Sequence, residues 1–425
     1  MSSYTVEELQ RAVGGRYLNG EAVGEAVGVS IDTRTLKPGE LFVALRGENH
    51  DGHDFLRQAF EGGAAGAVVD DKRSLGVLRQ EDRRVDVRRG AFIFLVEDTL
   101  KALQSLAAFN RSRFPIPLVA ITGSNGKTTV KEMTAACLAT TYTTLKNEAS
   151  LNNHIGLPLT LAHLDSSHQV ACAEMGMNHP GEIAALAALA RPLVGVVTNV
   201  GSAHLEFMKT LQGVQAAKGE LIEALPKEGT AVLNADDPMT LALSSKAKGR
   251  VVTFALEAKA DVKAEDVEDL GLDGVRFTLV AGGESAPVGL SVPGEHNVMN
   301  ALAASAAAYV MEVPAESIAR GLEQATLPKM RMERMSMGRW TIVNDAYNAN
   351  PDSTRAALKT FVKLKGSYPG AFCLGEMREL GEAAGEAHAQ AGRLAAATGA
   401  CCVTGFGATA GLRDYQATMT LAGLL

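Results

Sequence analysis

One segment, residues 122–129, constrains the fold more than any other part of the chain. It reads Thr-Gly-Ser-Asn-Gly-Lys-Thr-Thr and follows a short apolar run at 117–121, which predicts a buried strand. Residues 130–139 are compatible with a helix. A strand, a glycine turn and a helix N-terminus direct backbone N–H groups and the helix dipole at one point, which favours phosphate binding.

The side chains of this loop suit a nucleotide. Lys127 supplies a positive charge for the outer phosphates, and Thr128 supplies a hydroxyl for Mg²⁺. The commoner loop has a glycine where Ile121 stands, whereas here the glycines are Gly123 and Gly126, a tighter GxxGKT form. The alternative is a chance glycine turn, but the strand and helix context favours an ATP site. Other loop residues expected to contact ATP are Ser124, Asn125 and Thr129.

Composition limits the class of protein. With 425 residues, two or three domains are expected, and 46% hydrophobic and 21% charged residues are ordinary for a globular chain. A net charge of −7 without a long basic block argues against nucleic-acid binding. Five cysteines without CxxC spacing favour reduced thiols and a cytoplasmic location. We find neither a signal peptide at the N-terminus nor an apolar run long enough to insert into a membrane.

Strand and helix patterns alternate along most of the chain. Apolar runs at 118–122, 170–175, 193–200 and 231–235 are separated by helix patterns, which predicts an α/β fold with a mostly parallel central sheet. We expect three domains, at 1–85, 86–326 and 327–425, each with α/β character. An Arg-rich stretch at 79–89 is expected to be a surface connector, and the strand at 91–96 to open the central domain.

Ten motifs occur in an order that is informative as a set. Together they resemble the Mur ligase family of peptidoglycan synthesis over nearly the whole chain, and a further segment at 30–55 resembles the UDP-sugar-binding domain of that family. The ten motifs are TGSNGKTTVKEM (122–133), LNNHIGLPLTL (151–161), AEMGMNHPGEI (173–183), TNVGSAHLEF (198–207), AAKGEL (216–221), LNADDP (233–238), GEHNVMNALAA (294–304), MRME (330–333), NDAYNANPDS (344–353) and LGEMRELGE (374–382).

The last two motifs resemble the branch of the family that adds D-alanyl-D-alanine to UDP-N-acetylmuramoyl-tripeptide. These two molecules are therefore the expected substrates. The preceding, tripeptide-forming ligase of the family and a folylpolyglutamate-synthase-like ligase remain alternatives, as does a non-catalytic nucleotide-binding scaffold for wall-synthesis enzymes. We expect a monomer.

The resemblance implies the chemistry and its metal ions. ATP would phosphorylate the substrate carboxylate, and the amine would attack the resulting acyl phosphate. Two Mg²⁺ ions are implied: Thr128 and Glu174 would hold the first, and His204 would help to hold the second. Lys218 would carry a CO₂-derived carbamate that binds the second ion. Taken alone, His204 is more typical of an ordinary polar residue at a strand end, and Lys218 of a solvated surface lysine.

The other implied contacts fall into two groups. For ATP, Asn297 and the weaker candidate Asn300 would contact adenine, Arg331 the γ-phosphate and Asp345 the ribose. Asn297 could instead cap a helix at 297–311, and Arg331 and Asp345 could be surface ion pairs. For the substrates, the implied residues are Ser30, Thr33 and Arg34 at the uridine diphosphate, Asn152 at the peptide, and Asn348, Asn350 and Pro351 at the amine.

The chain departs from the family pattern at two places. Glu376 stands where the family more often has aspartate, which is a mild change. Relatives usually continue beyond the position of residue 425 with further βα units, so the third domain is expected to be shortened or the sequence truncated.

Overall fold

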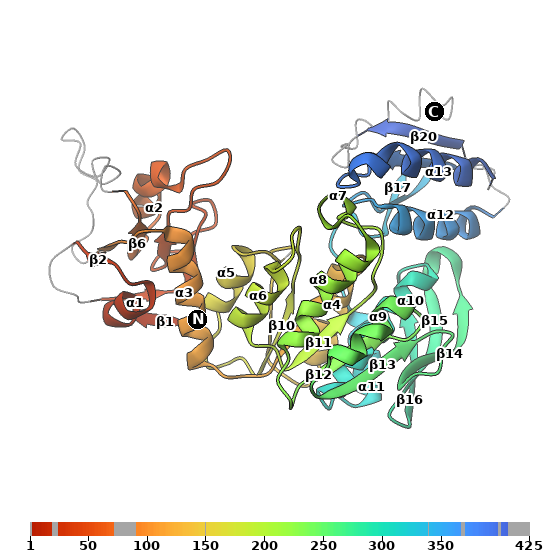
Figure 1. Ribbon diagram of the computed structural model, residues 1–425, viewed down its shortest axis with the longest axis horizontal. Helices are drawn as coiled ribbons and strands as arrows, with labels where there is room; N and C mark the ends of the chain where they lie inside the picture. The colour runs from red at the N-terminus through yellow and green to blue at the C-terminus, as the bar shows by residue number, and fades with distance from the viewer. Residues whose placement is uncertain are drawn as a thin grey trace. The chain divides into compact units, whose positions relative to one another are not determined.

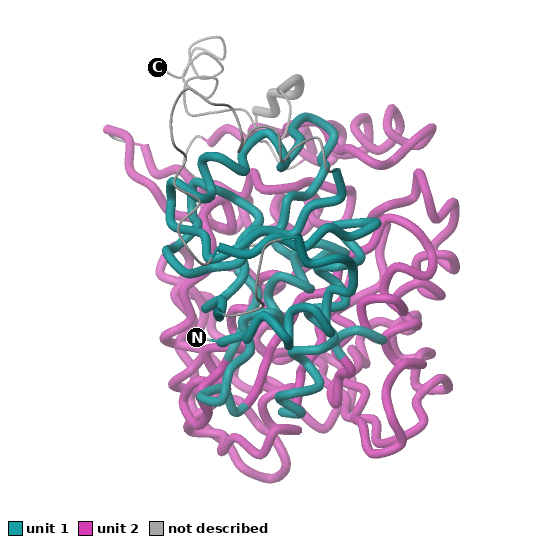
Figure 2. The backbone as a smooth tube through the Cα atoms, turned by 90° about the vertical axis from the view of Figure 1, so that its left-hand side faces the viewer, with its two compact units in different colours: residues 1–116, 145–169, 188–190 teal, residues 117–144, 170–187, 191–425 magenta. Residues whose placement is uncertain are grey.

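The computed structural model describes residues 2–18, 24–71, 91–148, 150–338, 340–366 and 370–397, together with the backbone of 401–406. The expected connector at 79–89 and the residues after 406 lie outside this description. The chain divides into two compact units, shown in Figure 2. The first comprises 1–116, 145–169 and 188–190, and the second 117–144, 170–187 and 191–425.

A five-stranded sheet forms the framework of the first unit. The strand order is β2-β7-β6-β5-β4, with β2 antiparallel to β7 and the other neighbours parallel. A separate antiparallel pair is formed by β1 (Ser3–Thr5) and β3 (Glu25–Val27). The sheet strands are β2 (Arg16–Tyr17), β4 (Val29–Ser30), β5 (Leu41–Val43), β6 (Gly66–Val69) and β7 (Phe92–Leu95).

The position of strand β7 differs from the one we expected from the sequence. We expected it to open the central domain, but it pairs in parallel with β6 and lies in the sheet of the first unit. Its aromatic residues Phe92 and Phe94 are fully buried against Tyr4 and Leu9 in the core of that unit. The first unit therefore continues through the following helix to residue 116. The boundary expected after residue 326 stays a prediction.

Two α-helices of the first unit, α1 and α3, begin at residues whose side chains cap the helix. Thr5 and Glu8 form a reciprocal capping box at the start of α1, and Asp98 accepts hydrogen bonds from the amides of Leu100 and Lys101 at the start of α3. These caps satisfy amides that have no partner within the helix. The helical elements are α1 (Val6–Val13), η1 (Gly52–Phe55), α2 (Leu56–Glu61), α3 (Thr99–Arg113) and α5 (Gly156–Ala162).

A mostly parallel sheet organises the second unit, labelled in Figure 1. Within this unit its strands follow the order β16-β15-β14-β13-β12-β11-β8-β10. The strands from β14 to β10 are parallel, and β14, β15 and β16 form an antiparallel extension. The bounds are β8 (Leu118–Thr122), β10 (Val170–Glu174), β11 (Val194–Val197), β12 (Thr230–Asn234), β13 (Arg250–Ala255), β14 (Val262–Asp269), β15 (Val275–Ala281) and β16 (Glu284–Leu290); β9 (Thr144–Lys146) spans the change of unit.

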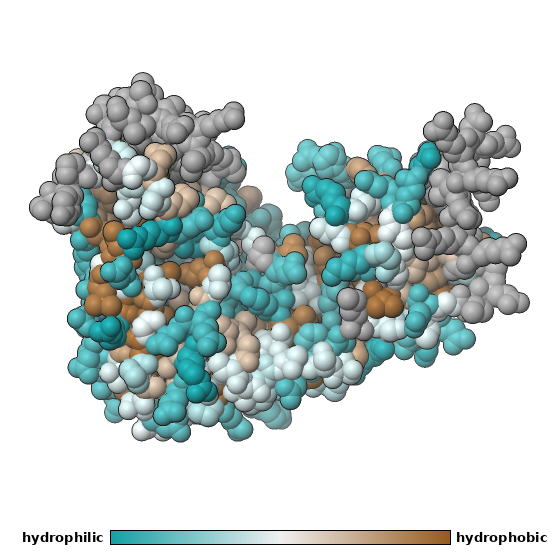
Figure 3. Space-filling model, turned by 180° about the vertical axis from the view of Figure 1, so that it is seen from behind, coloured by the Kyte–Doolittle hydropathy of each residue, from teal (hydrophilic) through white to brown (hydrophobic). Residues whose placement is uncertain are grey.

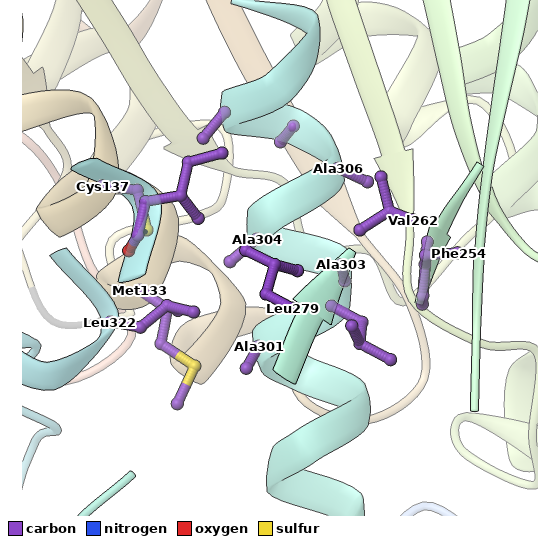
Figure 4. Close-up of a cluster of buried hydrophobic side chains, with 14 of the residues drawn as sticks. Met133, Cys137, Phe254, Val262, Leu279, Ala301, Ala303, Ala304, Ala306 and Leu322 are labelled. Carbon is purple, nitrogen blue, oxygen red and sulfur yellow. Dashed lines mark hydrogen bonds between the residues drawn. The ribbon is translucent and has the colours of Figure 1, made fainter. Parts of the chain in front are cut away.

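Helices cover this sheet, and the largest core lies beneath α10 (Glu295–Val310). In Figure 4, the alanines of α10 lie between Met133 and Leu322 on one side and Val262 and Phe254 on the other. Small side chains let the helix approach its neighbours closely. The remaining helical elements here are α4 (Lys127–Ala139), α6 (Glu182–Ala190), α7 (Leu205–Met208), α8 (Leu211–Ala224), α9 (Pro238–Leu241), η3 (Ala242–Lys246), η4 (Gly271–Asp273) and α11 (Ala315–Gln324).

In the residues from 333 onwards that the structure describes, the C-terminal part of the second unit has two short sheets and two α-helices. An antiparallel hairpin joins β17 (Glu333–Met337) to β18 (Trp340–Asn344), and a parallel pair joins β19 (Ala371–Gly375) to β20 (Cys401–Phe406). The helical elements are α12 (Pro351–Lys365), η5 (Gly381–Ala383) and α13 (Ala384–Ala397). The expected α/β class with a mostly parallel central sheet is confirmed.

The surface carries few large apolar side chains. Figure 3 shows hydrophobic residues interspersed with hydrophilic ones over one face. Among the described residues, no helix has both the length and the apolar character needed to cross a bilayer. Where the structure describes side chains, the exposed large hydrophobic residues are Phe55, Leu151, Phe207, Leu211, Leu241, Val267, Met330 and Tyr347.

The packing around α10 predicts a specific sensitivity to added volume. Ala304 is fully buried, so Ala304→Leu should force its neighbours apart and destabilise the protein by about 1–3 kcal/mol. Urea unfolding would measure the change. The control Ala216→Leu adds the same volume to an exposed position of α8 and should change stability little. Equal losses in both variants would contradict the packing argument.

Candidate active site

The loop between β8 and α4 has the backbone conformation that a phosphate site requires. Gly126 begins α4 with a φ of 80°, in the left-handed region that favours glycine. A Cβ at Gly126 would also lie 2.2 Å from Asn300 Oδ1, and one at Gly123 would lie 1.8 Å from Thr198 Oγ1. Any side chain at Gly123 or Gly126 would collide with these neighbours, so both positions require glycine. The N-terminus of α4 directly follows the loop.

A second loop, which follows β11, holds this one in place. The amide of Ser124 donates to Asn199 O at 3.0 Å, and the amide of Asn125 donates to Asn199 Oδ1 at 2.9 Å. Thr198 Oγ1 and Asn199 Nδ2 donate back to Asn125 O, at 2.6 and 3.1 Å. Ser124 Oγ exchanges hydrogen bonds with the backbone of Gly201. These bonds hold the phosphate loop in shape before any ligand binds.

Lys127 lies folded over the loop. Its Nζ donates to Gly123 O at 2.9 Å and to Ser124 O at 3.3 Å. Burial lowers the pKa of Lys127, while the nearby carboxylate of Glu174 acts in the opposite direction. The ammonium is thus beside the loop oxygens, where it can exchange these carbonyl contacts for phosphate oxygens.

Thr128 and Glu174 come together because β8 and β10 are parallel neighbours. Glu174 ends β10 and is 1% exposed, and Thr128 Oγ1 donates to its Oε2 at 2.9 Å. Thr129 is buried in the first turn of α4. A hydroxyl and a carboxylate side by side form an oxygen donor set that suits a hard cation such as Mg²⁺. Among the described residues, no group of three or more His, Cys, Asp or Glu side chains is arranged to hold a metal by itself.

The position of Lys218 differs from what its residue type alone predicts. The expectation of a solvated surface lysine is wrong, because Lys218 lies in α8 with 1% exposure. Burial lowers the pKa of Lys218 well below its usual value, and the charge of Lys127 lowers it further. The Lys218 ammonium has no hydrogen bond or ion pair to any residue that the structure describes.

His204 precedes α7 and faces the C-terminal part of the unit. Its Nδ1 lies 2.6 Å from Glu379 Oε2, and its side chain is 15% exposed. The two groups are close by distance, but their geometry is not that of a hydrogen bond. The contact with His204 lowers the pKa of Glu379. The metal role expected for His204 stays a prediction.

Asn297 and Asn300 lie one turn apart in α10. Gly294, not Asn297, caps this helix, so the capping alternative for Asn297 is wrong. Asn297 Nδ2 donates to Pro293 O at 2.8 Å, and Asn300 Nδ2 donates to Asn297 Oδ1 at 3.2 Å. Asn300 lies beside Gly126, which brings the N-terminal part of α10 next to the phosphate loop.

Arg331 reaches the phosphate loop from the C-terminal part of the unit. Its guanidinium carbon lies 4.2 Å from the centre of the Tyr347 ring, and its Nη2 donates to Thr128 Oγ1 at 3.5 Å. The alternative of a simple surface ion pair is therefore wrong for Arg331. Burial raises the pKa of Asp345 to about 6, opposed by the charge of Arg331 and by the Met332 amide.

The start of α12 also contacts the phosphate loop. Asn350 caps α12 through its Oδ1, and its Nδ2 donates to Asn125 Oδ1 at 2.7 Å. Asn350 thus acts as a helix cap, and both polar groups of its side chain have protein partners. Asn348 is exposed, and its Oδ1 accepts from the amide of Ala349. Pro351 is the first residue of α12.

The expected UDP-site residues lie in the first unit and form a polar turn. Ser30 Oγ bonds with the backbone of Asp32, and Thr33 Oγ1 donates to Gln58 Oε1 at 3.0 Å. Arg34 is exposed and forks onto the Asp32 carboxylate, which lowers the pKa of Asp32. Asn152, expected at the peptide, lies partly exposed in the loop before α5.

Sequence reasoning missed several residues near these positions. Glu379 lies in a motif that we used only to choose the family branch, and Asn199 lies in the TNVGSAHLEF motif. In the first unit, buried His53 links Asp51 to the amide of Asp70. Histidine between aspartates in the HDGHD segment was the available signal for that network.

Family models match the chain in three stretches. The model described as "Mur ligase family, catalytic domain" matches 25–111, "Mur ligase middle domain" matches 121–308, and "Mur ligase, glutamate ligase domain" matches 330–419. UDP-N-acetylmuramoyl-tripeptide–D-alanyl-D-alanine ligase of Escherichia coli is 38% identical over 388 residues, which is 90% of this chain and 82% of that protein.

Solved structures agree with these matches. A crystal structure of MurF from Acinetobacter baumannii is 30% identical with a TM-score of 0.82, covering 99% of this chain and 93% of that one. MurF ligase from Thermotoga maritima in complex with ADP is 27% identical with a TM-score of 0.72, covering 87% of this chain and 82% of that one. The three matched models and an identity of 38% over most of both chains show that this chain belongs to the Mur ligase family.

Proposed function

We propose that this chain is an ATP-dependent ligase that joins D-alanyl-D-alanine to UDP-N-acetylmuramoyl-tripeptide, forming an amide bond and releasing ADP and phosphate. The observation that carries the proposal is the convergence of Lys127, Thr128, Glu174 and Arg331 around the N-terminus of α4. The substrates are those in the name of the E. coli relative. The neighbouring tripeptide-forming reaction is the enzymatic alternative.

Amide formation from a carboxylate requires activation, which ATP supplies by phosphorylating the peptide carboxylate. The amides at the start of α4 and the ammonium of Lys127 would bind the β- and γ-phosphates. Arg331, whose guanidinium lies over the Tyr347 ring, would present its planar fork to the γ-phosphate as charge develops there. The amine of D-alanyl-D-alanine then attacks the acyl phosphate, and phosphate leaves.

The oxygen donors of Thr128 and Glu174 fit Mg²⁺, which usually retains waters and binds one or two carboxylates together with phosphates. Bound there, Mg²⁺ would neutralise phosphate charge. His204 is proposed to contribute to a second Mg²⁺ position. Asn297 and Asn300 are proposed at adenine and Asp345 at ribose, since each lies on an element that reaches the phosphate loop or Arg331.

Lys218 is proposed to carry a carbamate that serves the second Mg²⁺. A lysine reacts with CO₂ only when neutral, and its burial favours the neutral amine. Carbamylation would convert the buried Lys218 amine, which has no hydrogen bond or ion pair among the described residues, into an anionic group. A buried anion next to Lys127 and a metal ion would be compensated, whereas two buried ammonium groups would repel each other.

For the remaining partners we propose Ser30, Thr33 and Arg34 at the uridine diphosphate, Asn152 at the peptide, and Asn348 and Asn350 at the amine. A monomer is proposed because one chain supplies Thr128 and Arg331 to the same site. A cytoplasmic location is proposed because ATP and UDP-linked substrates are found there.

Phosphate release tests the reaction directly. With Mg-ATP and UDP-N-acetylmuramoyl-tripeptide, adding D-alanyl-D-alanine should start phosphate release, and mass spectrometry should find the pentapeptide product. A panel with single amino acids, including glutamate with a folate acceptor, is the control. Tight binding of ATP and UDP-sugar without phosphate release would instead support a non-catalytic scaffold.

The carbamate proposal predicts chemical rescue. Lys218→Ala should lose nearly all ligase activity because the anion is missing, and short carboxylic acids such as acetate should restore part of it. Initial rates with and without acid would show this. The control Lys227→Ala changes an exposed lysine after α8. It should retain activity, and added acid should not change its rate. Near-normal activity of Lys218→Ala without acid would exclude the carbamate.

The raised pKa of Asp345 predicts two pH effects between about 4 and 6. The folded state holds the Asp345 proton more tightly than the unfolded chain, so the free energy of unfolding should fall as pH rises through this window. The wild type should lose stability relative to Asp345→Asn over the same range. The KM for ATP should rise below pH about 6, because the ionised carboxylate accepts the ribose hydroxyl more strongly. Parallel pH profiles for both proteins would contradict this assignment.

A further inference from the structure

The hairpin of β17 and β18 holds the backbone on the C-terminal side of Arg331. Glu333 begins β17 and pairs in register with Asn344, the last residue of β18. Because the two strands are antiparallel, the residue before Glu333 faces the residue after Asn344. The amide of Met332 accordingly donates to Asp345 Oδ1 at 3.2 Å. The register of the hairpin therefore fixes the peptide that follows Arg331.

The backbone on the N-terminal side of Arg331 is held by the Glu333 side chain. The amide of Met330 donates to Glu333 Oε2 at 3.0 Å, and Asn344 Nδ2 donates to the same oxygen at 3.4 Å. One carboxylate thereby ties the residue before Arg331 to the start of β17 and to the end of β18. Arg331 lies between two backbone amides, at 330 and 332, that are each held by a carboxylate.

Both neighbours of Arg331 have a strained backbone. Met330 has a φ of 61° and Met332 a φ of 52°, in the left-handed region that residues other than glycine rarely adopt. Such a conformation persists only when surrounding contacts support it, and it is frequent at ligand-binding sites. The side chain of Met330 is exposed, so its packing does not account for the conformation. The hydrogen bond from the Met330 amide to Glu333 supplies support at this position.

The Arg331 guanidinium is presented to the phosphate loop. Its carbon lies 4.2 Å from the centre of the Tyr347 ring, and its Nη2 lies 3.5 Å from Thr128 Oγ1 at the start of α4. Among the residues that the structure describes, this guanidinium forms no ion pair with a carboxylate. Burial lowers the pKa of Lys127, and the charge of Arg331 acts in the same direction, so the two cations repel each other. A backbone fixed on both sides keeps the guanidinium there despite this repulsion.

We propose that Glu333 is a positioning residue: its carboxylate holds the Met330 amide, keeps the turn around Arg331 in its left-handed form and so presents the guanidinium to the γ-phosphate of ATP. ADP lacks this phosphate, so the turn should raise the affinity for ATP over that for ADP. The proposal rests on the proposed function for the γ-phosphate as the partner of Arg331. The hydrogen bonds that form the turn do not depend on it.

The first test measures nucleotide preference without turnover. Calorimetric titration with ADP and with β,γ-imido-ATP, both with Mg²⁺, gives the ratio of two dissociation constants, which isolates the γ-phosphate contact. Arg331→Ala should lower the preference for the triphosphate about tenfold or more, because charge-assisted hydrogen bonds are lost. Glu333→Ala should lower it by a similar factor with little change in ADP affinity, and Glu333→Gln, which keeps an acceptor oxygen, should restore most of it. The matched control Glu386→Ala, at an exposed position of α13, should leave the ratio unchanged.

A double variant shows whether Glu333 acts through Arg331. If it does, Glu333→Ala combined with Arg331→Ala should have the same ratio as Arg331→Ala alone, since the group to be positioned is already absent. A purely structural role would instead weaken the binding of both nucleotides and add to the effect of Arg331→Ala. Met330→Gly is the second variant. Glycine adopts a φ of 61° and many other values without strain, so this protein should stay folded in thermal unfolding while its preference for the triphosphate falls.

The outcomes separate this proposal from the proposed function. A lower ratio in Arg331→Ala with an unchanged ratio in Glu333→Ala, or additive effects in the double variant, would overturn the positioning role even in an active ligase. An unchanged ratio in Arg331→Ala would also overturn it. Should Glu333→Ala fail to fold, Met330→Gly decides: a lower ratio supports the role, and an unchanged ratio overturns it. The expected non-additive loss in a protein that releases no phosphate would support the positioning role and refute the ligase.

Discussion

The parallel pairing of β8 with β10 is the constraint on which the candidate site depends. It places the end of β10 beside the start of α4, so Glu174 reaches Thr128 across neighbouring strands. The same edge of the sheet receives the loop after β11, which holds the phosphate loop through Asn199. Carboxyl ends of parallel strands converge on one edge, which explains why residues far apart in sequence meet there.

The C-terminal part contributes to this edge through contacts of different kinds. Arg331 brings a charge, Asn350 bonds to the phosphate loop, and Glu379 faces His204. The Asn350 contact joins the phosphate loop to the element that we propose at the incoming amine. Activation of the carboxylate and attack by the amine would therefore depend on one docked arrangement, which would also exclude water from a reactive acyl phosphate.

The candidate site also contains several buried charged side chains. Lys127 lies close enough to feel the charge of Glu174, Lys218 lies close enough to feel that of Lys127, and burial lowers the pKa of both lysines. Buried charges without compensation are costly, so this arrangement is better explained by binding of polyanionic and cationic ligands than by stability. Glycine is required at 126 for a related reason, because a side chain there would fill space occupied by Asn300.

The sequence by itself determined the phosphate loop, the alternating α/β pattern and the family, because glycine spacing, helix capping and apolar periodicity act over short distances along the chain. It did not determine that Lys218 is buried, that Phe92–Leu95 belongs to the first sheet, or that Glu379 meets His204. Burial of a lysine depends on which elements cover its helix, and strand pairing and the His204–Glu379 contact join segments distant in the chain. Only the tertiary structure decides those contacts, since they result from the packing of whole elements and leave no periodic signal in either segment alone.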